Sequence, residues 1–221
     1  LISTLNDTSK LQDMKNTANE IINNFDDLVV LGIGGSNLCP LSLIGLCENQ
    51  SDTKLHFADN IDPHCMEQLL KKVNLKNTAF LAISKSGQTI ETLSQVFICL
   101  DALKENNVTN LGKHLYIITD PIVNSLRKIG NEIDATILDH EPGIGGRFST
   151  FTNVGLIPAI VAGLNPEEIH QGAQIVCNEV FQDKTSEPAK GAAASIALIN
   201  KGYSSTVIMP YISRLTNFTA W

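Results

Sequence analysis

Short apolar runs alternate with longer amphipathic stretches through the first two thirds of the chain. Runs of four to six apolar residues are typical of buried strands in a parallel sheet, and they predict strands at residues 28–33, 55–58, 79–84, 115–119 and 135–138. Apolar positions with a helical period predict helices between them, at residues 66–72, 89–105 and 122–129. This alternation predicts an α/β fold, a doubly wound parallel sheet with right-handed crossovers.

The pattern changes after about residue 148, where helical segments follow one another without strands between them. We expect helices at residues 150–162, 166–181 and 188–200, and one more strand at residues 205–209. Ser213 is a residue type that caps helix N-termini, and every third residue from 212 to 221 is apolar: Ile212, Leu215, Phe218 and Trp221. The sequence therefore predicts a C-terminal helical extension, and a last helix that is interrupted where the chain stops.

The composition is that of an ordinary globular protein, with 221 residues of which 43% are hydrophobic and 18% charged. The formal net charge is −7 and Lys and Arg form no block, which argues against a surface for nucleic-acid phosphates. The longest apolar run, residues 154–164, has 11 residues, whereas a bilayer requires about 20. No secretory signal is visible. We expect neither nucleic acid nor a membrane as a partner.

The cysteines indicate a reducing compartment. They are odd in number, widely spaced and form no C-x-x-C pair: Cys39, Cys47, Cys65, Cys99 and Cys177. Neither a disulfide framework nor a zinc site is expected from this pattern. We interpret them as reduced core thiols of a cytoplasmic protein.

A first glycine-rich turn, Gly32-Ile33-Gly34-Gly35-Ser36, follows the first predicted strand. A dinucleotide fingerprint would require glycine where Asn37 stands, so this turn does not favour a nicotinamide cofactor. The turn still lacks side chains where a ligand could approach the backbone, and Ser36 adds a hydroxyl. The alternative is a tight strand-to-helix turn without a ligand.

A second loop, Ser84-Lys85-Ser86-Gly87-Gln88-Thr89, joins the third predicted strand to the longest predicted helix of the α/β part. Three hydroxyls, one glycine and the amides of a helix N-terminus form an arrangement that binds a phosphate monoester. The loop lacks the Walker A pattern, so a small phosphorylated ligand is favoured over a nucleotide. The alternative is a Ser/Thr-capped helix start.

A third glycine-rich segment spans residues 143–149 and reads GIGGRFS. It presents Arg147 between a glycine turn and a helix start that Ser149 or Thr150 caps. A guanidinium held in this way can stabilise an anionic intermediate. The alternative for Arg147 is a surface salt bridge.

The three motifs together resemble the glucose-6-phosphate isomerase family, whose halves are sugar isomerase (SIS) domains; they read GIGGS, ISKSGQTIET and GGRFS in this order. The middle motif is typical of SIS domains in general, whereas GGRFS is more specific. The resemblance covers residues 28–221. It implies a helical lead-in at residues 1–27, an SIS sugar-phosphate-binding domain at residues 28–165, and a helical connection with the start of a truncated second part at residues 166–221.

The resemblance also implies a reaction and its participants. Members interconvert glucose 6-phosphate and fructose 6-phosphate in glycolysis and gluconeogenesis, act as homodimers, and need no metal or redox cofactor because an acid–base pair moves one proton. The implied sugar-phosphate contacts are Gly35 and Ser36, the hydroxyls of Ser84, Ser86 and Thr89, and the backbone of Lys85 and Gly87. Arg147 is implied as the catalytic cation that stabilises the cis-enediolate. Gln88 stands where many members carry another hydroxyl.

The family's proton-shuttling Glu lies in a motif that this sequence lacks, so we expect the chain to be a fragment that is inactive alone. That Glu would follow a few residues beyond Trp221. His170-Gln171-Gly172 superficially resembles the family's histidine motif, but we interpret His170 as a surface helix histidine. Two alternatives remain: a non-catalytic SIS sensor of sugar phosphates, and the isomerase domain of glucosamine-6-phosphate synthase. GGRFS favours the isomerase over both.

Overall fold

Five parallel strands form the centre of the molecule, in the order β2-β1-β3-β4-β5. The computed structural model describes residue 5, residues 7–47 and residues 51–221. The strands are β1 (Asp27–Leu31), β2 (Lys54–Ala58), β3 (Thr78–Ile83), β4 (Leu115–Thr119) and β5 (Thr136–Asp139). All five predicted strands of the α/β part are confirmed, with ends that differ by at most two residues.

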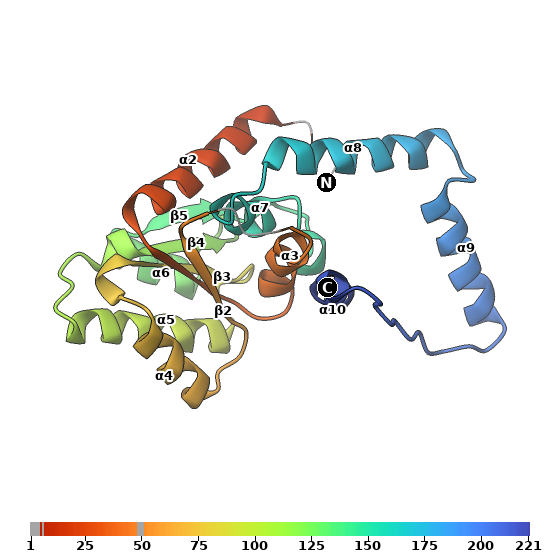
Figure 1. Cartoon of the computed structure of the whole chain (residues 1–221). Helices are drawn as coiled ribbons and strands as arrows, with labels where there is room; N and C mark the ends of the chain where they lie inside the picture. The colour runs from red at the N-terminus through yellow and green to blue at the C-terminus, as the bar shows by residue number, and fades with distance from the viewer. Residues whose placement is uncertain (1–4, 6, 48–50) are drawn as a thin grey trace.

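Helices cover both faces of this sheet, as a doubly wound fold requires (Figure 1). One face carries α2 (Thr8–Asn24), α3 (Gly35–Ile44) and α7 (Asn153–Val161). The other carries α4 (Pro63–Lys72), α5 (Ile90–Glu105) and α6 (Ser125–Glu132). Short 3-10 turns, η1 (Leu75–Asn77), η2 (Leu111–His114) and η3 (Gly146–Phe148), lie between these elements. Residues 1–4 and 6 of the predicted lead-in lie outside the described residues.

The strand side chains fill two separate layers of core. Along β1, Leu28 and Val30 pack toward α2 and α7, whereas Val29 and Leu31 pack toward α4 and α5. All four are buried, because a parallel sheet covered on both faces leaves no solvent side. This two-sided burial explains why the strands are continuous apolar runs in the sequence.

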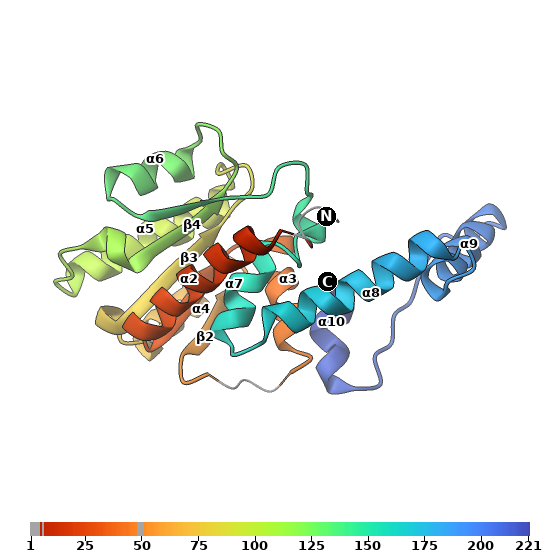
Figure 2. The same cartoon turned by 90° about the horizontal axis from the view of Figure 1, so that it is seen from above.

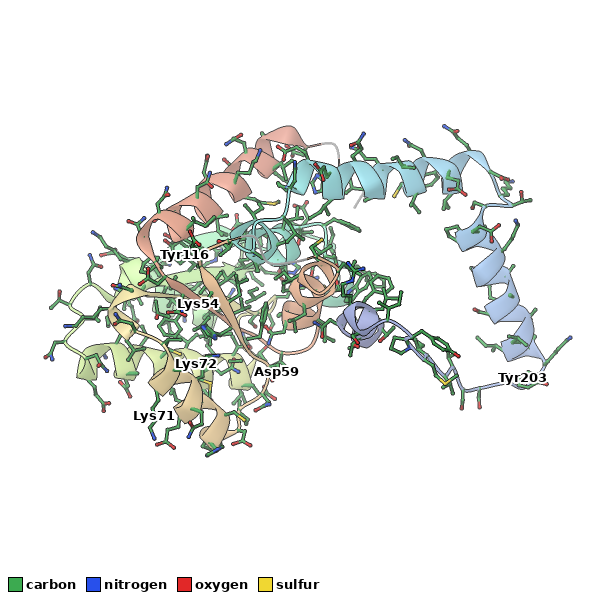
Figure 3. The ribbon with its side chains drawn as sticks, in the orientation of Figure 1. Lys54, Asp59, Lys71, Lys72, Tyr116 and Tyr203 are labelled. Carbon is green, nitrogen blue, oxygen red and sulfur yellow. The ribbon has the colours of Figure 1, made fainter. Side chains whose placement is uncertain are left out.

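Two helices leave this body as an arm, α8 (Pro166–Gln182) followed by α9 (Glu187–Asn200). Figures 1 and 2 show the arm extending away from the sheet in both views. Tyr203 lies at its far end (Figure 3). The chain then returns through residues 203–210 to η4 (Ser213–Leu215) and α10 (Thr216–Ala220), which lies against α3. The predicted C-terminal helical extension is therefore confirmed.

Several details of the sequence analysis are wrong. The helix after the third glycine-rich segment is capped by Thr152, whose hydroxyl accepts from the Val154 amide at 3.3 Å, and not by Ser149 or Thr150. Residues 205–209 are exposed and form no strand, because no neighbouring strand among the described residues offers them a hydrogen-bond ladder. Ser213 begins η4 instead of capping a helix. His170 is on a helix but is buried, with Nε2 3.4 Å from the carbonyl oxygen of Phe151. Apolar residues of the preceding segments cover it, which periodicity within α8 alone does not reveal.

The described residues also allow the expectations about membrane spans and cysteines to be examined. No helix among them has the length and apolar character that crossing a bilayer demands. All five cysteines are free. Cys39 and Cys99 are buried, but Cys47 and Cys65 are exposed, so the expectation of core positions is wrong for those two.

Candidate functional site

The strand order changes direction between β1 and β3. From β1 the chain moves to β2 on one side, and it then returns to β3 on the other side. In parallel α/β sheets, ligands bind at the carboxyl ends of the strands on either side of such a switch point. The GIGGS turn directly follows β1, and the SKSGQT loop directly follows β3. The topology therefore brings the first two predicted loops to the one edge position where this fold class binds ligands.

The SKSGQT loop is organised by its own hydroxyls. The Ser84 and Thr89 hydroxyls share a hydrogen bond of 2.9 Å, and the Gly87 amide donates to Ser84 Oγ at 3.1 Å. The Gln88 amide donates to the exposed Ser86 Oγ at 3.2 Å. Thr89 is the N-cap residue of α5, but its side chain makes no capping hydrogen bond. The start of α5 thus carries hydroxyls and unpaired amides, which together can bind an anion.

Gly87 fixes the shape of this loop. Its φ is +62°, a left-handed conformation that favours glycine. A Cβ here would lie 1.9 Å from Asn124 Oδ1. Asn124 cannot easily move, because Oδ1 accepts from the Arg127 amide at 2.9 Å and Nδ2 donates to Thr119 Oγ1 at 3.1 Å. The loop therefore requires glycine for two independent reasons.

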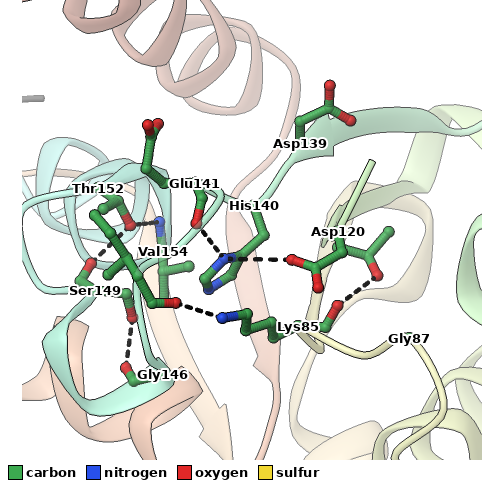
Figure 4. Close-up of polar contacts among 12 residues, drawn as sticks. Lys85, Gly87, Asp120, Asp139, His140, Glu141, Gly146, Ser149, Thr152 and Val154 are labelled. Carbon is green, nitrogen blue, oxygen red and sulfur yellow. Dashed lines mark hydrogen bonds and ion pairs between the residues drawn. The ribbon is translucent and has the colours of Figure 1, made fainter. Parts of the chain in front are cut away.

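The third loop packs against the other two, and Figure 4 shows Lys85 of the second loop beside it. Gly35, the first residue of α3, lies so close to η3 that a Cβ would be 2.5 Å from the Gly146 carbonyl carbon. The Lys85 ammonium donates to the Ile144 carbonyl oxygen at 2.7 Å. The structure thus joins all three glycine-rich segments, which are separated by about 50 residues or more in the sequence.

A cavity of about 360 Å³ opens between the loops that follow β1, β3 and β4. Its size is within the range of small-molecule sites, roughly 300–1,000 Å³. The predicted residues that line it are Ser36, Ser84, Lys85, Ser86 and Thr89. Gly35 and Gly87 shape the adjoining backbone but do not line it.

Arg147 is placed differently from these residues. It is exposed on η3, and its guanidinium does not line the cavity. Its backbone is fixed, because the Trp221 indole Nε1 donates to the Arg147 carbonyl oxygen at 2.7 Å. The structure therefore places the Arg147 backbone beside Gly35 and leaves the side chain without a hydrogen bond or ion pair to the rest of the described chain.

Two residues that the sequence analysis missed also line the cavity. Thr92 lies one turn after Thr89 on α5, and its Oγ1 is buried without a hydrogen-bond partner in the described part of the chain. Asp120 is the first residue after β4. The i, i+3 spacing from Thr89 could have identified Thr92, and the position after a predicted strand could have identified Asp120.

His140 lies behind the cavity wall and is 1% exposed. Its Nδ1 is 3.1 Å from the Glu141 carbonyl oxygen and 3.8 Å from Asp120 Oδ1 (Figure 4). Burial lowers the pKa of His140, and the contacts with the Glu141 carbonyl and Asp120 oppose this effect. Burial therefore favours the neutral form of the ring beside the site.

The hydrogen-bond donors of the site are hydroxyls, amides and one ammonium, and Asp120 adds a carboxylate. Among the described residues, no group of three or more His, Cys, Asp or Glu side chains is placed to hold a metal ion. Serine and threonine hydroxyls, helix amides and lysine are groups that bind phosphate. The geometry thus suits a small phosphorylated ligand.

Comparison with known proteins relates the chain to one family. A sequence model described as phosphoglucose isomerase matches residues 8–221. A glucose-6-phosphate isomerase of Carboxydothermus hydrogenoformans is 36% identical over 224 aligned residues, which cover 96% of this chain and 48% of that protein. One from Rubrobacter xylanophilus is 33% identical, covering 88% of this chain and 48% of the relative. The chain spans about half the length of the curated relatives it matches.

Solved structures show the same fold. The crystal structure of a hypothetical protein from Thermus thermophilus superposes with a TM-score of 0.89 at 29% identity, covering 99% of this chain and 52% of that one. A glucose-6-phosphate isomerase from Chlamydia trachomatis gives a TM-score of 0.78 at 23% identity, covering 96% of this chain and 42% of that one. The α/β architecture and the position of the helical arm are therefore shared with longer proteins.

Proposed function

Because the chain belongs to the phosphoglucose isomerase family, we propose that it is the phosphate-binding half of an enzyme that interconverts glucose 6-phosphate and fructose 6-phosphate. The observation that carries this proposal is the cavity at the switch point between β1 and β3, lined by Ser36, Ser84, Ser86 and Thr89 together with Lys85. The hydroxyls and the ammonium supply donors for a phosphate, and the cavity has space for a small ligand.

A bound phosphate would replace the hydrogen bond between the Ser84 and Thr89 hydroxyls. Ser84 and Thr89 bond each other in the described structure, so a phosphate oxygen can accept from both hydroxyls once they turn toward the cavity. Ser86 and the Lys85 and Gly87 amides complete the proposed cradle. Gly35 and Ser36 would meet the sugar part of the ligand, since Ser36 lines the same cavity from the β1 side.

Isomerisation requires a proton to move between C2 and C1 of the open-chain sugar, through an enediolate. We assign no base to this chain, and no cofactor; a Glu from the other half of the protein would move the proton. The Arg147 guanidinium makes no hydrogen bond or ion pair with the rest of the described chain and extends from a fixed backbone, so it is available to stabilise the enediolate charge.

The chain alone would bind substrate without catalysing its conversion. The chain matches about half of each relative, which supports the assignment of substrate binding to this half and proton transfer to the other. Within the chain, residues 28–165 would form the sugar-phosphate-binding SIS domain, residues 1–27 a helical lead-in, and residues 166–221 the connection to the second half. Homodimer assembly, a cytoplasmic location and a place in glycolysis and gluconeogenesis belong to the same proposal.

Binding can be tested directly on the 221-residue chain. Millimolar fructose 6-phosphate should shift the NMR signals of the Ser84–Thr89 amides, and Ser86→Ala should weaken binding about tenfold, since a hydrogen bond to a charged group contributes roughly 1.5–3 kcal/mol. Ser195→Ala is the matched control, because Ser195 is exposed on α9 and bonds only its own helix. Unchanged spectra in a well-folded sample would refute phosphate binding at this loop.

The role of Arg147 is tested in the full-length enzyme. Arg147→Ala should lower kcat about 10²–10³-fold with little change in KM, because the cation acts on charge that develops in the transition state. Ser86→Ala should raise KM instead, and Arg147→Lys should recover part of kcat by restoring the charge. A kcat near wild type for Arg147→Ala would contradict a catalytic role for the Arg147 guanidinium.

A further inference from the structure

The cavity contains a carboxylate where a phosphate is proposed to bind. Of the residues that line it, Lys85 carries a positive charge and Asp120 a negative one. A carboxylate repels a phosphate dianion, so its presence needs a reason. We infer that Asp120 is a specificity-determining residue, which selects phosphate esters carrying hydroxyl groups over inorganic phosphate. This inference rests on the proposed function and names the ligand class of the same site.

Asp120 is held against the phosphate loop by its backbone. Its amide donates to the Lys85 carbonyl oxygen at 3.0 Å, and the Thr119 hydroxyl donates to the same oxygen at 3.3 Å. The side chain of Lys85 extends toward Ile144, to whose carbonyl oxygen its ammonium donates. The backbone of Asp120 is thus fixed next to the proposed phosphate position.

The Asp120 carboxylate accepts no hydrogen bond from the rest of the described chain. Figure 4 shows it directed at His140, whose Nδ1 lies 3.8 Å away, beyond a normal hydrogen bond. Burial favours the neutral form of His140, and Nδ1 faces the Glu141 carbonyl at 3.1 Å. The Lys85 ammonium is engaged with the Ile144 carbonyl. The Asp120 side chain, 24% exposed, therefore has free acceptor positions for a ligand.

The Asp120 carboxylate discriminates between inorganic phosphate and sugar phosphates. Inorganic phosphate brings negative charge to Asp120 and offers it few hydrogen-bond donors. A sugar phosphate carries hydroxyls on the carbon chain, and a hydroxyl that donates to a carboxylate forms a charge-assisted bond. A site built to hydrogen-bond a hydroxyl disfavours an analogue that lacks it. The charge of Asp120 thus weakens the binding of both anions. Hydrogen bonds from ligand hydroxyls to Asp120 restore affinity only for the sugar phosphate.

The test compares inorganic phosphate and fructose 6-phosphate on the full 221-residue chain by isothermal titration calorimetry. Asp120→Asn removes the charge and keeps the shape. It should raise the affinity for inorganic phosphate about fivefold and lower the preference for fructose 6-phosphate about tenfold, which equals about 1.4 kcal/mol. Asp120→Glu keeps the charge, so its affinity for inorganic phosphate should stay close to wild type.

Asp59→Asn is the matched control. Asp59 directly follows β2 as Asp120 follows β4, but it lines a separate cavity with His56 and Leu69 (Figure 3). Asp59→Asn should leave the affinities for inorganic phosphate and fructose 6-phosphate unchanged. Circular dichroism spectra should be identical for all variants. An unchanged preference in Asp120→Asn, or an equal gain in phosphate affinity in Asp120→Glu, would overturn the inference while leaving the proposed function intact. Failure of the wild type to bind fructose 6-phosphate would overturn both.

Discussion

The α/β body and the α8–α9 arm contain the same kinds of apolar residue in different surroundings. In the body, Val29 and Phe80 are excluded from solvent between the sheet and its helices. In the arm, α9 has no buried residue, and Phe181 at the end of α8 is 70% exposed. The comparison teaches that apolar periodicity predicts the type of an element, whereas burial depends on whether another element lies against it.

The largest expected effect distinguishes the two regions by one substitution made twice. Phe80→Ala in β3 should lower the free energy of unfolding by about 3–5 kcal/mol, since it removes a buried aromatic side chain and leaves a cavity. Phe181→Ala in α8 should change it by less than about 0.5 kcal/mol, as is usual for exposed positions. Urea denaturation followed by circular dichroism measures both.

The pair of phenylalanine variants can also contradict the comparison. A loss of more than about 1 kcal/mol in Phe181→Ala would mean that the arm packs against other residues in solution. A loss below that value in Phe80→Ala would mean that the β3 core is loosely packed. The midpoint and the slope of each transition need to be compared, because a changed slope indicates a change in the surface exposed on unfolding.

The body could be predicted from the sequence because its elements leave local signals. The strands β1, β3 and β4 are buried on both sides and read as uninterrupted apolar runs. The segment at residues 205–209 contains a shorter apolar run, Val207-Ile208-Met209, but forms no strand. A strand needs a neighbour to complete its hydrogen bonds, and a run of apolar residues does not specify that neighbour.

The candidate site was predictable where it depends on consecutive residues. The motifs identified the GIGGS turn and the SKSGQT loop, which follow β1 and β3 at one edge of the sheet. The contributions of Thr92, Asp120 and His140 depend on which loops meet in three dimensions. The bond from Lys85 to the Ile144 carbonyl crosses 59 residues and leaves no periodic signal in the sequence.

Glycine substitutions test the comparison between the body and the arm further, with smaller expected changes in the free energy of unfolding. Gly87→Ala should lower the free energy of unfolding by about 1–3 kcal/mol, through its left-handed backbone and the clash with Asn124. It should also weaken fructose 6-phosphate binding at least tenfold, since the loop must change shape. Gly143→Ala is the matched control: φ is +78°, but a Cβ there meets no atom within 4 Å, so only the backbone effect of about 1 kcal/mol remains.

The arm should respond to the same substitution with the opposite sign. Gly191 lies inside α9, and a Cβ there meets no atom within 4 Å. Gly191→Ala should stabilise the helix by up to about 1 kcal/mol, because alanine loses less backbone entropy than glycine on entering a helix. Amide hydrogen exchange should therefore slow about fivefold in α9 and stay unchanged in β3. Equal slowing in both would show that the arm and the body unfold as one cooperative unit, against the independence that their packing indicates.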